Sequence, residues 1–303
     1  MHQSRIHTWL TALRLPTILL ATSSVMMGSA LAIHSHQWHV AVGVLAWLTA
    51  ALLQLITNLA NDYGDFERGA NVEKRVSAAG THGLTLAQIR RALVVLVVLA
   101  SVLGVVLLGV AKGVANLPTP WLLRFLLLGG CSIVAAITYT MGAKPYAYMG
   151  LGDVSVFGFF GIVGVAGTAF LHHPVLRVAY VLPVIATGCF AVAVLNVNNI
   201  RDMESDKQVA KKTLVVRMGK RFGICYQWCL LLVGISSLLL FTYWHQQSHW
   251  QWLYVVTIPL LIRNGILTTV RPAGELTQVL QNLVLLIFGT TLLFTIGIAC
   301  AAG

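Results

Sequence analysis

Apolar residues occur in long runs along this chain, and polar residues gather in short segments between the runs. Each run is about 20 residues long, which is what an α-helix needs to cross the hydrocarbon core of a bilayer. The pattern predicts membrane-spanning helices at approximately 14–34, 38–60, 89–111, 120–141, 151–171, 177–199, 221–243, 251–271 and 280–301. The expected fold is therefore an all-α integral membrane protein, a bundle of about nine transmembrane helices.

The order of the runs suggests a single transmembrane domain, 1–303, with a diverged internal repeat. Residues from about 1 to 150 and from 151 to 270 each provide four spans, and the ninth helix stands alone. The first apolar run, from Leu15 to Ile33, exceeds the 7–15 residues that are usual in a secretory signal. We therefore expect it to be retained as a membrane span.

Composition agrees with a membrane protein and explains the charge. The chain is 57% apolar and 10% charged, whereas soluble domains carry about 25% charged residues. The net charge of +11 would suit a nucleic-acid partner, but the basic residues lie in short loops between the spans. With a cytoplasmic N-terminus and a periplasmic C-terminus, all of the 20 basic residues except Lys112, Arg124 and Arg177 fall on the cytoplasmic side. The expected partner is thus the lipid bilayer, with no nucleic acid.

Two clusters of amides and carboxylates follow the second and sixth spans. The first is Asn58-Leu-Ala-Asn61-Asp62-Tyr-Gly-Asp65, and the second is Asn198-Asn199-Ile-Arg201-Asp202-Met-Glu-Ser-Asp206. In both clusters an Asn precedes an Asp by four positions, which places the two side chains one turn apart on one helix face. All nine acidic residues of the chain fall on the predicted cytoplasmic side. The clusters therefore indicate a site on that side.

Carboxylate and amide oxygens are hard ligands that suit Mg2+. Two facing clusters can each hold one ion and clamp a diphosphate between them, while Lys and Arg cover the remaining oxygens. If the diphosphate leaves an allylic carbon, the apolar bundle shields the resulting carbocation from water. A cation-coupled transporter is the alternative, but it predicts acidic residues near the bilayer midplane. A purely structural subunit leaves the paired clusters unexplained.

The motifs Asn58-x-x-x-Asp62-x-x-Asp65 and Asn198-x-x-x-Asp202-x-x-x-Asp206 resemble the two aspartate-rich motifs of the UbiA superfamily of intramembrane prenyltransferases. The resemblance covers nearly the whole chain. The strings at 58–65, 139–142, 150–153 and 212–219 are similar to the branch that acts on 1,4-dihydroxy-2-naphthoate. Two positions depart from the family pattern: Gly69 stands where many relatives have a third Asp, and Arg14-Leu-Pro16 stands where relatives often have Arg-Pro.

The resemblance implies roles for particular residues. The metal ligands would be Asp62, Asp65, Asp202 and Asp206, supported by Asn58 and Asn198, and they would hold two Mg2+ ions that bridge the diphosphate. Candidate diphosphate contacts are Arg68, Lys144, Arg201 and Lys212, and further substrate contacts are Asn61 and Asn199. Tyr139 and Asp153 would line the site of the aromatic acceptor, with Asp153 as a candidate base.

The implied reaction is transfer of a polyprenyl group from polyprenyl diphosphate to 1,4-dihydroxy-2-naphthoate with loss of the carboxylate, a step of menaquinone biosynthesis. Prenylation of 4-hydroxybenzoate, in which the carboxylate is retained, is the alternative acceptor chemistry. The expected location is the bacterial inner membrane, with the active site facing the cytoplasm.

Overall fold

The computed structural model describes residues 5–67 and 84–302, and its regular elements are helices. The α-helices are α1 (Arg5–Leu13), α2 (Ile18–His34), α3 (Val40–Glu67), α4 (Leu86–Val114), α5 (Thr119–Thr138), α6 (Gly152–Val156), α7 (Thr168–His172), α8 (Val181–Gln208), α9 (Leu214–Met218), α10 (Lys220–Trp244), α11 (Ile258–Val270) and α12 (Leu276–Ala302). The 3-10 and π segments are η1 (Leu15–Thr17), η2 (Tyr146–Met149), η3 (Phe157–Gly167), η4 (Val178–Tyr180), η5 (His249–Thr257) and η6 (Ala273–Glu275).

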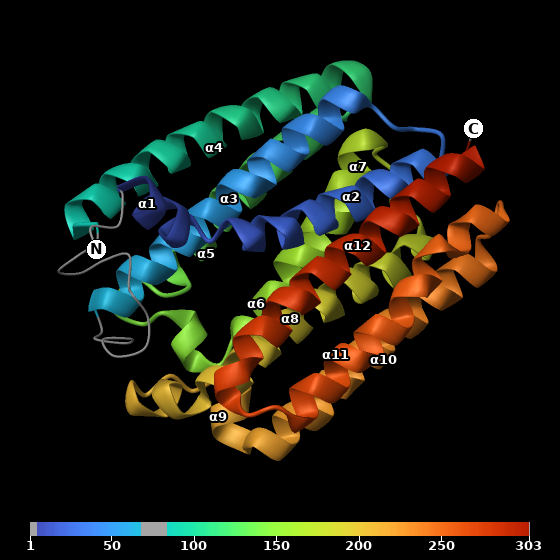
Figure 1. Ribbon diagram of the computed structural model, residues 1–303. Helices are drawn as coiled ribbons and strands as arrows, with labels where there is room; N and C mark the ends of the chain where they lie inside the picture. Colours follow the sequence, from blue (N-terminus) through green and yellow to red (C-terminus); the bar gives the residue numbers. More distant parts are fainter. Residues whose placement is uncertain (1–4, 68–83, 303) are drawn as a thin grey trace.

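Nine helical stretches within these described residues are long and apolar enough to cross a membrane. Several of them combine neighbouring elements, for example α6, η3 and α7 in the stretch Gly152–His172. The helices run alongside one another in one bundle, with α1 and the end of α12 on opposite sides of it (Figure 1). The predicted all-α membrane fold is confirmed, while the direction in which the bundle crosses the membrane and the internal repeat remain predictions.

Two helices extend further than the hydropathy pattern predicts. The second and sixth spans were expected to end near residues 60 and 199, but α3 continues to Glu67 and α8 to Gln208. Hydropathy falls where the side chains become polar, whereas the backbone hydrogen bonds of a helix continue regardless of side-chain polarity. Both Asn/Asp clusters therefore lie on the last turns of long helices, where helical geometry fixes the direction of each side chain.

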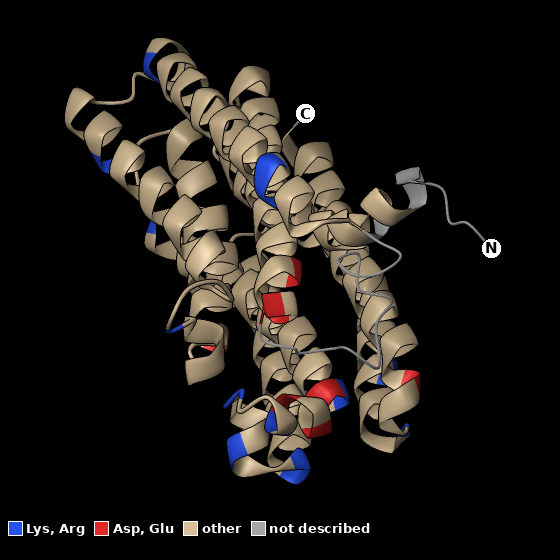
Figure 2. Ribbon diagram, turned by 90° about the vertical axis from the view of Figure 1, so that its left-hand side faces the viewer, with Lys and Arg blue, Asp and Glu red and all other residues tan. Residues whose placement is uncertain are grey.

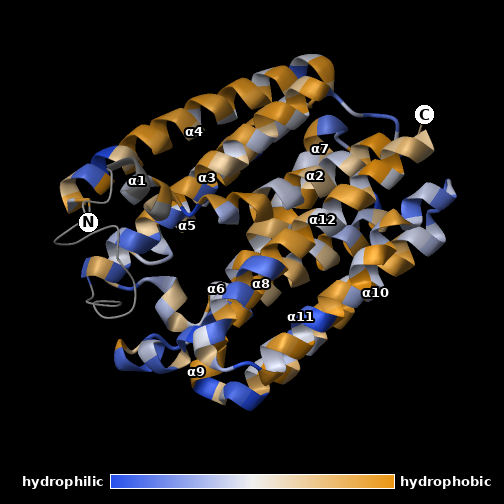
Figure 3. Cartoon of the chain, viewed as in Figure 1, coloured by the Kyte–Doolittle hydropathy of each residue, from blue (hydrophilic) through white to orange (hydrophobic). Residues whose placement is uncertain are grey.

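The bundle has two larger packed regions. One is built around α2, α8, α10 and α12, and the other joins α3 to α4 and α5. Small residues let backbones approach closely at the contacts between helices, as is common in membranes. At Gly161 of η3 a Cβ would lie 2.8 Å from the carbonyl oxygen of Val184 in α8, so only glycine fits this contact. The outward faces of the long helices are mostly apolar (Figure 3).

Acidic residues gather in one half of the molecule, around the ends of the inner helices (lower half of Figure 2). The C-terminal ends of α3 and α8 lie there, and the short η2 and α9 segments join them. The backbone N–H of Lys212 donates to the carbonyl of Tyr148 at 3.0 Å, and the Arg217 guanidinium donates to the carbonyl of Met149 at 2.7 Å. These bonds join the segment after α5 to α9 and to the loop that precedes α9.

Candidate functional site

A cavity of about 590 Å³ penetrates the bundle between α2, α3, α4, α5, η3 and α8. Residues of both Asn/Asp clusters line its polar end: Asn61, Asp65, Asn198, Asp202 and Asp206. The fold thus brings together two clusters that lie far apart in the sequence. This cavity is the candidate active site.

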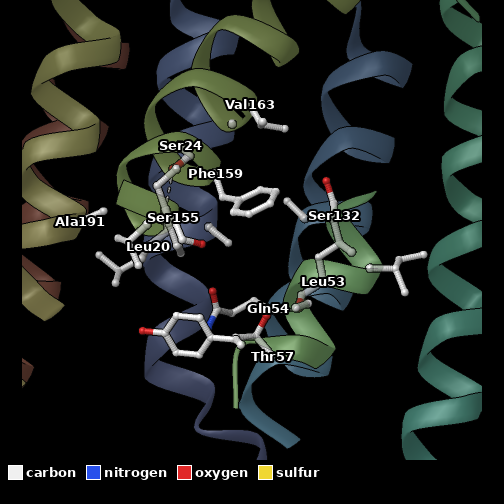
Figure 4. A pocket seen from close by; sticks show the side chains of 18 of the residues that line it. Leu20, Ser24, Leu53, Gln54, Thr57, Ser132, Ser155, Phe159, Val163 and Ala191 are labelled. Carbon is white, nitrogen blue, oxygen red and sulfur yellow. Dashed lines mark hydrogen bonds between the residues drawn. The ribbon is translucent and has the colours of Figure 1, made fainter. Parts of the chain in front are cut away.

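The inner wall of the cavity is mostly apolar, with isolated polar groups (Figure 4). Leu20, Leu53 and Phe159 point into it, together with hydroxyl groups such as that of Ser132. The Ser132 hydroxyl donates to the carbonyl of Leu128 in its own helix at 2.7 Å, so its hydrogen is already used. The wall therefore offers few unsatisfied polar groups and suits a hydrocarbon chain.

Asn58 is buried and joins α3 to the linker that precedes α2. Its Nδ2 donates to the carbonyl of Leu13 at 2.7 Å and to the hydroxyl of Thr17 at 2.8 Å, and its Oδ1 accepts from Gln54 at 3.0 Å. It does not line the cavity. In this arrangement Asn58 fixes the linker, and it does so one turn before Asp62 on the same helix face.

The same linker carries Arg14, whose guanidinium pairs with the carboxylate of Asp62. Arg14 has left-handed backbone angles (φ 44°, ψ 52°) where the chain turns from α1 into η1. This turn directs the side chain to the cavity, which Arg14 lines. The departure from the Arg-Pro pattern noted above therefore does not remove Arg14 from the site.

The end of α5 and the η2 segment hold the rest of the first cluster. The Thr140 hydroxyl donates to the Ala60 carbonyl at 2.9 Å and to Asn61 Oδ1 at 3.1 Å. The Tyr148 hydroxyl donates to Asp65 Oδ1 at 3.1 Å. Sequence reasoning did not identify Thr140 or Tyr148, because tyrosine and threonine are common at the ends of membrane helices.

In the second cluster, Arg201 binds both oxygens of Asp202, at 2.8 and 2.7 Å, and also donates to Asn198 Oδ1 at 2.6 Å. Asp206 Oδ1 lies 3.4 Å from the Lys211 ammonium group. Among the described residues, the buried Oδ2 of Asp206 has no hydrogen-bond partner. Carboxylates and cations thus alternate at this side of the cavity.

Lys211 lines the cavity and lies 5.8 Å from the centre of the Tyr148 ring. Its neighbour Lys212, proposed from the sequence, is exposed and does not line the cavity, and the same is true of Lys144. Asn199 is buried outside the cavity lining. Arg68 lies outside the described residues. The run of basic residues after the second cluster indicated cations near the site, but the sequence did not show that Lys211, and not Lys212, lines the cavity.

Tyr139 lines the cavity between the two clusters. Burial raises the pKa of its hydroxyl, and the nearby Tyr146, Asp153, Asp206 and Asp65 raise it further. The hydroxyl therefore stays protonated around neutral pH and acts as a hydrogen-bond donor, not as a base. Gly152 leaves room for it, since a Cβ at that position would lie 3.0 Å from the Tyr139 oxygen.

Asp153 occupies a different environment from the one the sequence suggested. It is buried and does not line the cavity, and its carboxylate lies near the Tyr226 hydroxyl of α10. Its Oδ1 has no hydrogen-bond partner among the described residues. Asp153 thus lies beside Tyr139 but behind the cavity wall.

The donor set fits Mg2+. The described residues contain no group of three or more His, Cys, Asp or Glu side chains close enough to hold a metal by themselves. Mg2+ is usually bound by one or two carboxylates together with phosphate oxygens. The carboxylates of the two clusters and the unpartnered Asp206 Oδ2 match that pattern, because a phosphate ligand would complete the coordination.

Similar proteins were found in bacteria. The chain is 40% identical over 301 residues to a 1,4-dihydroxy-2-naphthoate octaprenyltransferase of Escherichia coli, an alignment covering 97% of this chain and 96% of that protein. It is 36% identical to a protein of the same description from Haemophilus influenzae, covering 98% of this chain and 97% of the other.

Solved structures share the fold. The apo structure of a UbiA homologue from Aeropyrum pernix has a TM-score of 0.67 at 14% identity and covers 95% of this chain and 98% of its own. A UbiA homologue from Archaeoglobus fulgidus bound to GPP and Mg2+ has a TM-score of 0.58, also at 14% identity, and covers 95% of this chain and 99% of its own. Residues 19–273 match the UbiA prenyltransferase family, and the chain therefore belongs to that family.

Proposed function

We propose that this protein transfers a polyprenyl group from polyprenyl diphosphate to 1,4-dihydroxy-2-naphthoate and releases carbon dioxide, forming demethylmenaquinol. The observation that carries the proposal is the 40% identity, over 97% of the chain, to an Escherichia coli enzyme described by this donor and acceptor. The cavity supports it, because a polar end with carboxylates and cations continues into an apolar interior.

The diphosphate is held at the polar end. Asp62, Asp65, Asp202 and Asp206 are the residues that we propose would hold two Mg2+ ions, which when bound would neutralise the diphosphate and make it a better leaving group. Arg14, Arg201 and Lys211 already lie beside these carboxylates and are the proposed diphosphate contacts. Arg14 and Lys211 line the cavity, and Arg201, which does not line it, is bonded to Asp202, which does. Each of the three has a long side chain that can turn from a carboxylate to a diphosphate oxygen.

The prenyl chain occupies the apolar interior. When the bond between the allylic carbon and the diphosphate oxygen breaks, the positive charge spreads over the allyl group. The walls formed by Leu20, Leu53 and Phe159 keep water away from that cation. Without this protection, water would capture the cation as a prenyl alcohol.

The acceptor ring lies against Tyr139 in this proposal. The protonated Tyr139 hydroxyl donates a hydrogen bond to a ring oxygen and so fixes which carbon faces the cation. The ring carbon that carries the carboxylate forms the new bond to the allylic carbon. Its bond to the carboxylate then breaks, carbon dioxide leaves, and the released electron pair restores the aromatic ring.

This sequence requires no base to remove a proton from the ring carbon. The carboxylate itself supplies the electron pair, so the reaction does not depend on Asp153 as a proton acceptor. That agrees with the location of Asp153 behind the cavity wall. We propose instead that Asp153 orients Tyr226 and the adjoining α6 segment.

The proposed location is the inner membrane, with the polar end of the cavity facing the cytoplasm. The supporting argument is the excess of Lys and Arg in the loops at that end. The acceptor would then enter the cavity from the cytoplasm, and the released diphosphate would leave to the same side.

The test is an assay of the purified protein with Mg2+, a polyprenyl diphosphate and a panel of hydroxylated aromatic acids. Prenylated product is expected with 1,4-dihydroxy-2-naphthoate and not with 4-hydroxybenzoate. If 4-hydroxybenzoate is prenylated and the naphthoate is inert, the acceptor is assigned wrongly. If no acceptor reacts and the diphosphate stays intact, prenyl transfer itself is contradicted.

A further inference from the structure

Arg263 carries a charge inside a membrane-spanning stretch, away from the candidate active site. It lies in α11, seven positions before Val270, the last residue of that helix. At a rise of 1.5 Å per residue, its Cα is about 10 Å from the helix end. In the part of the chain that the structure describes, no side chain hydrogen-bonds or pairs with Arg263. Charged side chains at such depth are costly and usually mark a binding role.

Arg263 lines a groove of about 270 Å³ between α11 and α12. The helix α11 lies at the edge of the bundle, against α10 and α12 (Figure 1), and a hydrophilic break partway along it is visible in Figure 3. Leu260 and Leu285 border the groove and are 46% and 56% exposed. The groove therefore opens to the lipid and not to the interior cavity.

Asn264 adds a buried acceptor to the groove. It is 2% exposed, and its Nδ2 donates to the carbonyl of Val279 at 2.9 Å. Its Oδ1 is buried and has no hydrogen-bond partner among the described residues. A buried amide oxygen without a donor costs free energy. The groove thus combines a cation that needs an anion with an acceptor that needs a donor.

We propose that this groove binds the head group of a glycerophospholipid from the leaflet at the active-site end of the bundle. Arg263 holds the phosphate, Asn264 Oδ1 accepts a hydrogen bond from a head-group hydroxyl or amine, and the acyl chains lie along Leu260 and Leu285. The long Arg263 side chain reaches from its depth toward the interface, where lipid phosphates lie.

Charge complementarity favours a lipid over a second copy of the chain. A second copy would have to present a carboxylate on its lipid-facing surface. The exposed acidic residues that the structure describes, Glu67, Glu204 and Glu275, stand near helix ends. Glu275 is already paired with Arg271 at 2.5 Å. The phosphodiester of a membrane lipid supplies the missing anion at the interface, toward which the long Arg263 side chain extends.

The test is native mass spectrometry of the detergent-solubilised protein titrated with phosphatidylglycerol, which offers both a phosphate and hydroxyl donors. Arg263→Gln is expected to weaken lipid binding by about five-fold, the effect of losing one cation near a lipid phosphate. Arg271→Gln is the matched control, because it removes the same charge at the end of the same helix, outside the groove. Its lipid binding should equal that of the unmodified protein.

Two further measurements test the role of Asn264 and the possibility that a second copy of the chain occupies the groove. Asn264→Leu should weaken phosphatidylglycerol binding, and phosphatidylcholine, whose head group has no hydrogen-bond donor, should bind less tightly than phosphatidylglycerol to the unmodified protein. Equal phosphatidylglycerol binding by the Arg263→Gln variant and the unmodified protein overturns the proposal. So does an oxidative dimer formed in membranes by Leu260→Cys and absent from the unmodified protein, because a second copy would then cover the groove. If Arg263→Gln does not fold, Asn264→Leu decides alone.

Discussion

Arg14 and Asp62 form an ion pair although 48 positions separate them in the sequence. The pair joins the linker before α2 to the first Asn/Asp cluster on α3. In the second cluster, on α8, Arg201 likewise pairs with Asp202, to which it donates two hydrogen bonds. Each cluster thus keeps a guanidinium beside the carboxylate that we propose as a metal ligand.

If those carboxylates hold the metal, removing one charge should slow turnover strongly. Asp62→Asn and Asp202→Asn keep the side-chain shape, and each is expected to lower the turnover number by a factor on the order of 10²–10³. Glu204→Gln is the control, because Glu204 is exposed on the same helix as Asp202 and, among the described residues, pairs only with Lys207. Normal turnover of both Asp variants would show that the clusters do not hold the diphosphate.

Arg14 is expected to act on substrate binding. Arg14→Gln removes a charge-assisted contact to the diphosphate, so KM for the polyprenyl diphosphate should rise about ten-fold while KM for the acceptor stays the same. Arg91→Gln, at an exposed position of α4, is the comparison. If only the KM for the aromatic acceptor rises, Arg14 contacts the acceptor and not the diphosphate.

Metal binding should depend on the diphosphate. Among the described residues, no three His, Cys, Asp or Glu side chains lie close enough together to hold a metal, so we expect phosphate oxygens to contribute to the coordination. Electron paramagnetic resonance with Mn2+ as the probe should show at least about ten-fold tighter binding when pyrophosphate is present. EDTA should abolish prenyl transfer, and Mg2+ should restore it. Equally tight Mn2+ binding without pyrophosphate would contradict the shared site.

The cavity should set which prenyl chains fit. Gly129 of α5 lines the cavity, and a Cβ there would meet no atom within 4 Å. Gly129→Leu therefore adds a side chain at a point of the cavity wall that has room for its Cβ, and it should lower kcat/KM for long polyprenyl diphosphates about ten-fold relative to geranyl diphosphate. Gly109→Leu is the matched control, because Gly109 is equally unobstructed but does not line the cavity. An unchanged chain-length preference in the Gly129 variant would place the prenyl chain elsewhere.

The sequence predicted the membrane helices well because each depends on a local property, a run of apolar residues long enough to span a bilayer. It placed the helix ends less well. Asp65 and Asp206 were expected beyond the spans, yet both lie within α3 and α8, since a polar turn ends the hydropathy signal without ending the helix.

Individual side chains were harder to assign than the clusters. Lys211 lines the cavity and Lys212 does not, although the two are adjacent and identical in type. Asp153 lies behind the wall and Arg14 reaches the rim, and in both cases the direction of the side chain depends on backbone turns and on partners distant in sequence. Local patterns carry no information about such partners.

The most direct test of the proposed reaction follows the carboxylate of the acceptor. Purified protein is incubated with Mg2+, polyprenyl diphosphate and 1,4-dihydroxy-2-naphthoate labelled with ¹⁴C in its carboxyl group, and released carbon dioxide is compared with the prenylated product. We predict one labelled carbon dioxide for each prenyl group transferred, with no label in the product. Prenylated product that retains the label would contradict attack at the carboxylate-bearing carbon.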